Sequence, residues 1–154
     1  MKWQIPINLL NQIQAHGEAA YPEEGAGFLL GYEEGRIRLL VSILAAENSR
    51  ENGSRNNRYL LSPEELRRGE DTAQRLGLML LGVFHSHPDH PAQPSEFDRE
   101  WALPWFSYLI TSVQQGKAEV TRSWRLVDDR EKFNEEEILT EMQFSSPRSR
   151  YDHT

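Results

Sequence analysis

Apolar residues recur along the chain with two periods, one typical of helices and the other typical of strands. The first pattern is a helical spacing of apolar positions from Ile5 to Ile13, and good helix formers continue to about Ala20. Pro22 then prevents the helix from continuing, because its ring is incompatible with a helix interior. The pattern therefore predicts an amphipathic helix near the start of the chain.

Two further helices begin at recognisable caps. Ser62-Pro63-Glu64-Glu65 combines an N-cap serine, a proline at the first helical position and a glutamate at the capping-box position. A helix is therefore expected over residues 62–76, and Gly77 closes it. A short helix is expected over residues 95–101.

Short apolar or alternating runs bounded by glycine, proline or turn residues predict strands. The first two form a hairpin across Glu33-Glu34-Gly35, and a polar stretch from Glu47 to Asn57 leads away from them. The expected strands cover residues 26–32, 36–46, 59–61, 78–84, 105–113 and 118–127.

Strands and helices follow one another without a strict βαβ rhythm. This order predicts an α/β fold of the mixed α+β kind, with a central mixed β-sheet flanked by at least two helices. A chain of 154 residues suits a single domain that buries its own core. With no cysteine, the protein has no disulfide, no thiolate nucleophile and no cysteine-ligated zinc site, so histidine, aspartate or glutamate must hold any metal.

The composition also excludes several partners. A formal net charge of −7, without a basic stripe, argues against a protein that binds nucleic acid through its phosphates. No apolar run approaches the roughly 18 residues that span a membrane, and the first residues lack the apolar core of a signal peptide, so we expect a cytoplasmic protein. The polar, aperiodic residues 145–154 predict a flexible C-terminal tail.

His85-Ser86-His87-Pro88 closes the apolar run at residues 78–84 and is a candidate metal site. Residues i and i+2 of a strand share one face, about 6.6–6.8 Å apart, so the two imidazoles can converge on one ion. Pro88 favours this interpretation because it fixes the exit of the chain. The alternative is that both histidines are simply solvated or hydrogen-bonded at the end of a strand.

Asp98 can supply a third ligand. It lies eleven residues past His87 and three past Ser95, in the first turn of the expected helix, so its carboxylate can face back toward the end of the strand. A fourth position would remain for water. Ser95 and Asp98 also match a capping box, with the serine as N-cap and an acid at the third helical position. The two interpretations are compatible. Zinc hydrolysis also needs a general base that is not a ligand, and composition cannot choose one among 24 acids.

The histidine pair and the spaced Ser95-Glu96-Phe97-Asp98 together resemble the signature of the JAMM/MPN+ metalloprotease family, in its compact prokaryotic form. The upstream segment from Tyr21 to Gly31 resembles the family segment that carries a catalytic glutamate, which matches Glu24 here. The resemblance extends over residues 7–127. It implies a cytidine-deaminase-like JAMM/MPN fold and a metalloprotease domain over residues 1–144.

On this resemblance, His85, His87 and Asp98 bind one Zn²⁺ per chain. Glu24 acts as general base and then acid, and Ser95 donates a hydrogen bond to the oxyanion. The bond broken is a peptide or isopeptide bond after the C-terminal Gly-Gly tail of a ubiquitin-like or sulfur carrier protein. Ala26 departs from related bacterial proteins, which often carry cysteine, and we interpret this as a packing substitution.

Two other functions stay open. The chain could be a non-catalytic binding module of the same fold, although retention of the complete set of site residues favours an enzyme. It could also be a zinc hydrolase for small amides or dipeptides without a protein partner.

The remaining histidines are weaker candidates. His90 is near enough in sequence to reach the same ion, but Pro88 and Pro91 are expected to turn it outward. His16 lies near the end of the first helix, where a cation suits the helix dipole, and His153 lies in the tail.

The aromatic residues raise two questions about packing. Trp101, Trp105, Phe106 and Tyr108 are expected in the core, although one ring could line a substrate groove. Trp3 could pack on the sheet or on a second subunit, which leaves a homodimer open.

Overall fold

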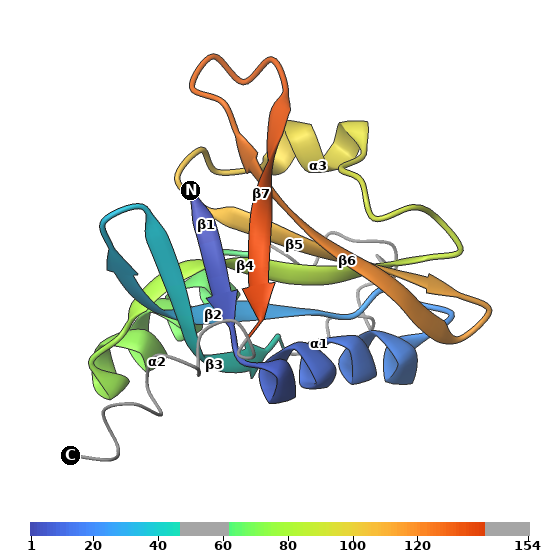
Figure 1. Ribbon diagram of the computed structural model, residues 1–154, viewed down its shortest axis with the longest axis horizontal. Helices are drawn as coiled ribbons and strands as arrows, with labels where there is room; N and C mark the ends of the chain where they lie inside the picture. Colours follow the sequence, from blue (N-terminus) through green and yellow to red (C-terminus); the bar gives the residue numbers. More distant parts are fainter. Residues whose placement is uncertain (47–61, 141–154) are drawn as a thin grey trace.

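The computed structural model describes residues 1–46 and 62–140, apart from the side chain of Trp101. The polar connection at 47–57, the strand expected at 59–61 and the tail at 145–154 lie outside the described residues. Three helices and seven strands make up the described part (Figure 1). They are β1 (Lys2–Ile5), α1 (Ile7–Ala20), β2 (Ala26–Glu34), β3 (Ile37–Ala45), α2 (Pro63–Leu76), β4 (Met79–Pro88), α3 (Glu96–Trp101), β5 (Ser107–Gln114), β6 (Lys117–Leu126) and β7 (Phe133–Thr140).

The seven strands close into a barrel in the order β1-β3-β2-β4-β5-β6-β7. β4 and β5 are parallel, as are the pairs that β1 makes with β3 and β7, and the other pairs are antiparallel. The mixed sheet flanked by helices is therefore confirmed. Its closure into a barrel was not anticipated, because two of its strands were not predicted.

Those two strands are β1 and β7, which pair with each other and complete the barrel. The prediction that Ile5 belongs to the first helix is wrong. Ile5 ends β1 and is fully buried, and α1 begins only at Ile7, after Pro6. Trp3 is also fully buried and packs with Ile5, so it lies inside the fold and not on a second subunit.

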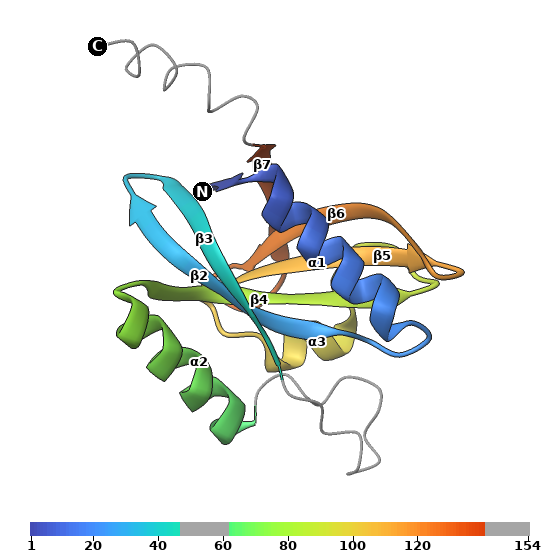
Figure 2. The same cartoon turned by 90° about the horizontal axis from the view of Figure 1, so that it is seen from below.

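Two apolar clusters cover the two faces of the central strands. Ile13 of α1 packs with Leu29, Leu81 and Phe84 on one face. Ala73 of α2 belongs to the cluster on the other face, which includes Phe28, Leu30 and Val83. In Figure 2, α1 crosses the strands while α2 lies apart from it. None of the three described helices is long and apolar enough to cross a bilayer.

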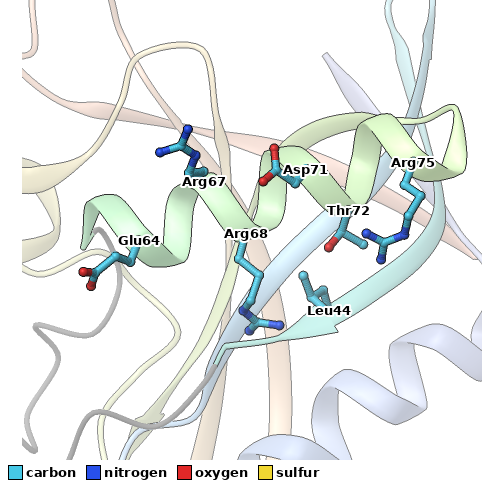
Figure 3. A pocket seen from close by; sticks show the side chains of 7 residues that line it. All are labelled: Leu44, Glu64, Arg67, Arg68, Asp71, Thr72 and Arg75. Carbon is cyan, nitrogen blue, oxygen red and sulfur yellow. The ribbon is translucent and has the colours of Figure 1, made fainter.

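The helix caps follow the sequence signals. Ser62 accepts a hydrogen bond from the backbone N–H of Glu65, and Gly77 adopts a left-handed conformation at the end of α2. Glycine suits that conformation because it has no Cβ. A hollow of about 500 Å³ runs along α2 beside Leu44, with charged side chains of both signs (Figure 3). It contains none of the predicted site residues.

Candidate metal centre and active site

The register of β2 against β4 places the candidate residues on one face. Ala26 pairs with His85, and the Ser86 N–H donates to the carbonyl of Gly25 at 3.0 Å. Continuing this register by one further residue sets Glu24 opposite His87. Because paired residues share a face of the sheet, Glu24 lies on the side to which the two histidines point.

Three side chains converge at the end of β4. The Nε2 atoms of His85 and His87 lie 3.2 Å apart. Asp98 Oδ1 lies 3.5 Å from His85 Nε2, and Asp98 Oδ2 lies 3.3 Å from His87 Nε2. All three residues are buried, and they form the one cluster in the described part of the chain whose ligand atoms are placed to hold a metal ion. The structure therefore brings together the three predicted ligands.

The helix α3 delivers Asp98 to this cluster through its cap. Ser95 Oγ accepts the backbone N–H of Asp98 at 3.0 Å, and the Ser95 N–H donates to Asp98 Oδ2 at 2.8 Å. This capping box was predicted and is confirmed. It fixes the first turn of the helix so that the carboxylate points back toward β4.

Electrostatics favour an ionised carboxylate at the centre. Burial alone would raise the pKa of Asp98, but the imidazole of His85, together with hydrogen bonds from His87 and Ser95, lowers it well below its ordinary value. Burial likewise lowers the pKa of His87, and the interactions with Asp98, the Pro91 carbonyl and Glu24 outweigh this effect and raise it. The site therefore combines the carboxylate of Asp98 with the imidazoles of His85 and His87, and these three groups are suitable ligands for a metal cation.

Hydrogen bonds orient the second histidine more firmly than the first. His87 Nδ1 lies 2.9 Å from the Pro91 carbonyl, which can only accept, so Nδ1 donates there and Nε2 is the nitrogen that faces the cluster. His85 Nδ1 is buried and has no hydrogen-bond partner among the described residues. His85 is instead fixed by the strand and by packing.

A hollow of about 350 Å³ opens beside the cluster. Its walls include Glu24, His87 and Ser95, which puts the predicted base and the predicted oxyanion donor on the same cavity as a predicted ligand. Prolines supply much of the remaining wall, at Pro88, Pro91 and Pro94. Such a wall is stiff, because each proline fixes its own φ.

The loop that forms this wall is held by side chains from β4, β5 and β6. They bind three consecutive backbone carbonyls of the loop, those of residues 90–92. The His90 carbonyl accepts from Ser112 Oγ at 2.7 Å, the Pro91 carbonyl faces His87 Nδ1, and the Ala92 carbonyl accepts from Trp124 Nε1 at 3.0 Å. Ser112 and Trp124 were not singled out from the sequence. No local signal marks them, because their partners are backbone atoms of a distant loop.

The other predicted positions fall outside the cluster. His90 is exposed at the edge of the hollow and is not one of the converging ligands. His16 is half-buried with its ring edge-on to Phe84 at 5.4 Å, and burial lowers its pKa, which disfavours the cation expected at the helix end.

The expected aromatic cluster is only partly core. Phe106 and Tyr108 are buried, as expected. Trp105 is 40% exposed and covers the Arg38 guanidinium at 4.4 Å, away from the walls of this hollow.

Fold and site together define a barrel domain with a His-x-His pair and an aspartate, placed so that they could hold a metal ion, beside a glutamate. A family model of prokaryotic homologs of the JAB domain matches residues 6–127, so the chain belongs to this family. The predicted resemblance to JAMM/MPN+ proteins is thereby confirmed.

Individual relatives agree with this assignment. A probable TtuB-protein conjugate cleaving protease of Thermus thermophilus is 32% identical over 113 residues, which are 71% of this chain and 72% of that protein. The solution structure of a protein from Salinibacter ruber is 42% identical, with 91% of each chain covered and a TM-score of 0.71.

A more distant structure shares the fold alone. It is described as a metalloprotease-like zinc site of the JAMM type in the proteasome and signalosome, at 16% identity and a TM-score of 0.52. The comparison covers 90% of this chain and 99% of that one.

Proposed function

We propose that the protein is a zinc-dependent metallopeptidase that cleaves a peptide or isopeptide bond after the C-terminal Gly-Gly tail of a ubiquitin-like or sulfur carrier protein. The observation that carries the proposal is the convergence of His85, His87 and Asp98 on a hollow that Glu24 also lines. The name of the Thermus relative supports the substrate class. We assign the activity to a domain within residues 1–144, followed by a tail.

The distances among the ligand atoms test whether zinc fits. Bonds of about 2.0–2.1 Å place the corners of a tetrahedral zinc site about 3.3–3.4 Å apart. The two imidazole Nε2 atoms lie 3.2 Å apart. Asp98 presents one oxygen to each of them, Oδ1 at 3.5 Å from His85 Nε2 and Oδ2 at 3.3 Å from His87 Nε2, which is close to the spacing of a tetrahedral site. Two imidazole nitrogens and one carboxylate oxygen also form a ligand set that zinc prefers, and three protein ligands leave one position open.

Bound zinc would supply Lewis acidity, which polarises the scissile carbonyl and makes water acidic enough to lose a proton near neutral pH. Glu24 accepts that proton as water attacks the carbonyl carbon. When the carbon–nitrogen bond breaks, Glu24 returns the proton to the departing amine. The carboxylate can perform both steps from one place because it lines the same hollow as His87.

Ser95 is suited to stabilise the oxyanion that forms during the attack. Its oxygen accepts the Asp98 N–H, so its own hydroxyl hydrogen is not used in the cap. Ser95 is exposed on the wall of the hollow. It can therefore cap α3 and donate to the substrate at the same time.

The proposed roles predict a separation of metal binding from hydrolysis. Glu24→Gln removes the proton acceptor and leaves all three ligands, so zinc content should remain near one per chain while cleavage falls by at least about 100-fold. Zinc is measured by atomic emission, and cleavage with a carrier protein fused to a reporter peptide after Gly-Gly. Glu23→Gln is the matched control and should cleave like the parent.

Two results would contradict this proposal. Cleavage by Glu24→Gln at the parent rate would remove Glu24 from its role. A parent protein that holds less than about one tenth of a zinc and gains no activity on zinc addition would favour a non-catalytic binding module. Short peptides in the same assay separate a small-amide hydrolase from an enzyme that needs the carrier.

A further inference from the structure

Ser86 lies between the two histidines, and its side chain faces the opposite side of β4. It is 2% exposed and packs against α1, where a Cβ added to Gly17 would come within 3.0 Å of the Ser86 Cβ. Ser86 therefore belongs to neither the metal cluster nor the hollow. Its hydrogen bonds nevertheless lead to the site.

Two polar groups of Ser86, its hydroxyl oxygen and its backbone N–H, bind the same residue, Gly25, which directly precedes β2. Ser86 Oγ accepts the N–H of Gly25 at 2.9 Å, and the Ser86 N–H donates to the Gly25 carbonyl at 3.0 Å. The Gly25 N–H belongs to the peptide unit that joins Glu24 to Gly25. Anchoring that unit fixes the backbone of Glu24 and thereby the direction of its side chain.

The α1 helix closes the other side of Gly25. A Cβ at Gly25 would lie 2.7 Å from His16 Nδ1 and 3.1 Å from the Ala20 Cβ, so only glycine fits between the strand and the helix. The segment that carries Glu24 is thus held by hydrogen bonds on one side and by steric contact on the other.

We infer that Ser86 is a positioning residue for Glu24. Ser86 holds the segment that carries Glu24, and its two neighbours, His85 and His87, are the candidate metal ligands. The tripeptide 85–87 therefore sets the place of the proposed base relative to the proposed ligands. The inference rests on the proposed function, because it concerns the place of the base in that reaction. A misplacement of about 1 Å can cost about 100-fold in rate.

The main test is Ser86→Ala compared with Thr111→Val. Thr111 is a suitable control because it pairs with Ser86 on the adjacent strand β5, is 1% exposed, and directs its hydroxyl to Thr121 at 2.8 Å. We expect Ser86→Ala to lower kcat about 10- to 100-fold with KM and zinc content unchanged. Thr111→Val should keep the parent kcat.

A double variant separates positioning from a general structural effect. In a Glu24→Asp background the carboxylate is already displaced, so Ser86→Ala should cost clearly less than it does in the parent. An equal cost in both backgrounds, a parent-like kcat, or a loss of zinc that parallels the loss of rate would overturn the inference. If Ser86→Ala does not fold, Ser86→Cys, which keeps the shape of the side chain at a slightly larger size and weakens the acceptor, is judged by the same outcomes.

Amide exchange tests the contact without any substrate. Exchange of the Gly25 N–H, followed by NMR, should be slow in the parent and faster in Ser86→Ala, with other β4 amides unchanged. If the parent cleaves no substrate, the proposed function fails, and this measurement still decides whether Ser86 anchors Gly25. Unchanged exchange at Gly25 would overturn the inference while leaving the function intact.

Discussion

In the proposed function, Asp98 and Ser95 would each use one side chain for two purposes. One carboxylate oxygen of Asp98 accepts the Ser95 N–H while the pair of oxygens faces the two histidines at 3.5 and 3.3 Å. A carboxylate can do both because its two oxygens offer about four lone-pair sites. The sequence pattern fitted both a cap and a metal ligand, which are compatible, and the geometry accommodates both at one position.

The two roles of Ser95 can be separated by substitution to glycine. Glycine is nearly as good an N-cap as serine, so Ser95→Gly should lower the free energy of unfolding by only a few tenths of a kcal/mol. Loss of the oxyanion donor should lower kcat by about 100- to 1000-fold. Urea denaturation and cleavage of a Gly-Gly fusion give the two quantities.

Ser62→Gly is the control for this experiment, because Ser62 caps α2 in the same way without lining the hollow. It should show the same small change in stability and the parent kcat. If both variants cleave like the parent, Ser95 acts only as a cap.

At the scale of elements, the convergence of the three candidate metal ligands could be predicted from the pattern of residues, and the place of the candidate base could not. His85, His87 and Asp98 lie within one short stretch, and the strand and helix periods already direct them together. Glu24 comes from the segment just before β2, and only the register of β2 on β4, continued past Ala26, sets it opposite His87. Among so many acids, resemblance to a family was needed to select it.

The missed strands have a physical reason too. β7 contains three consecutive glutamates, and the middle one, Glu136, is buried. A buried charge breaks the alternation of apolar and polar residues on which strand prediction depends. β1 has only four residues, which is too short for a periodic signal.

The parallel pair β4–β5 depends on a glycine. A Cβ at Gly82 would lie 2.0 Å from the carbonyl oxygen of Ser107, its partner in the register. Gly82→Ala must therefore push the two backbones apart, and we expect a loss of about 3 kcal/mol or more in the free energy of unfolding.

Gly69→Ala is a useful comparison for Gly82→Ala in urea denaturation. Its Cβ would meet the ring of Phe28 at 3.2 Å, which a small shift of the ring relieves, and alanine gains about 1 kcal/mol of helix propensity. Its net effect should be small. If Gly82→Ala were as stable as Gly69→Ala, the close approach of β4 and β5 at Gly82 would not be needed for stability.

At the scale of the whole molecule, a buried polar network ties the barrel together. Arg38 is fully buried and donates to Glu33, to the Leu81 and Trp105 carbonyls, and to Ser107 Oγ at 2.7 Å. Ser107 and Ser123 in turn both donate to Glu136 Oε1 at 2.8 Å. The network therefore joins strands from β2 to β7 around the barrel, at positions that an apolar pattern would not identify.

Charge makes this network sensitive to substitution. Burial lowers the pKa of Arg38, and the hydrogen bond that Arg38 donates to Glu33 acts in the opposite direction, so its partners stabilise the buried guanidinium. When one member of such a buried ion network is removed, the oppositely charged member is left buried without a partner. The resulting loss of stability is larger than the net stabilisation that the intact network provides.

We therefore expect Arg38→Met to lower the free energy of unfolding by about 3–5 kcal/mol, because it removes the cation that pairs with Glu33 and that interacts, through Ser107, with the buried Glu136. Arg36→Met, two residues earlier and exposed, should change stability by no more than about 0.5 kcal/mol. Adding Glu136→Gln to Arg38→Met should recover part of the loss, since it removes the uncompensated charge. Urea denaturation of the four proteins decides the matter, and equal stability of the two single variants would mean that the network does not hold the barrel closed.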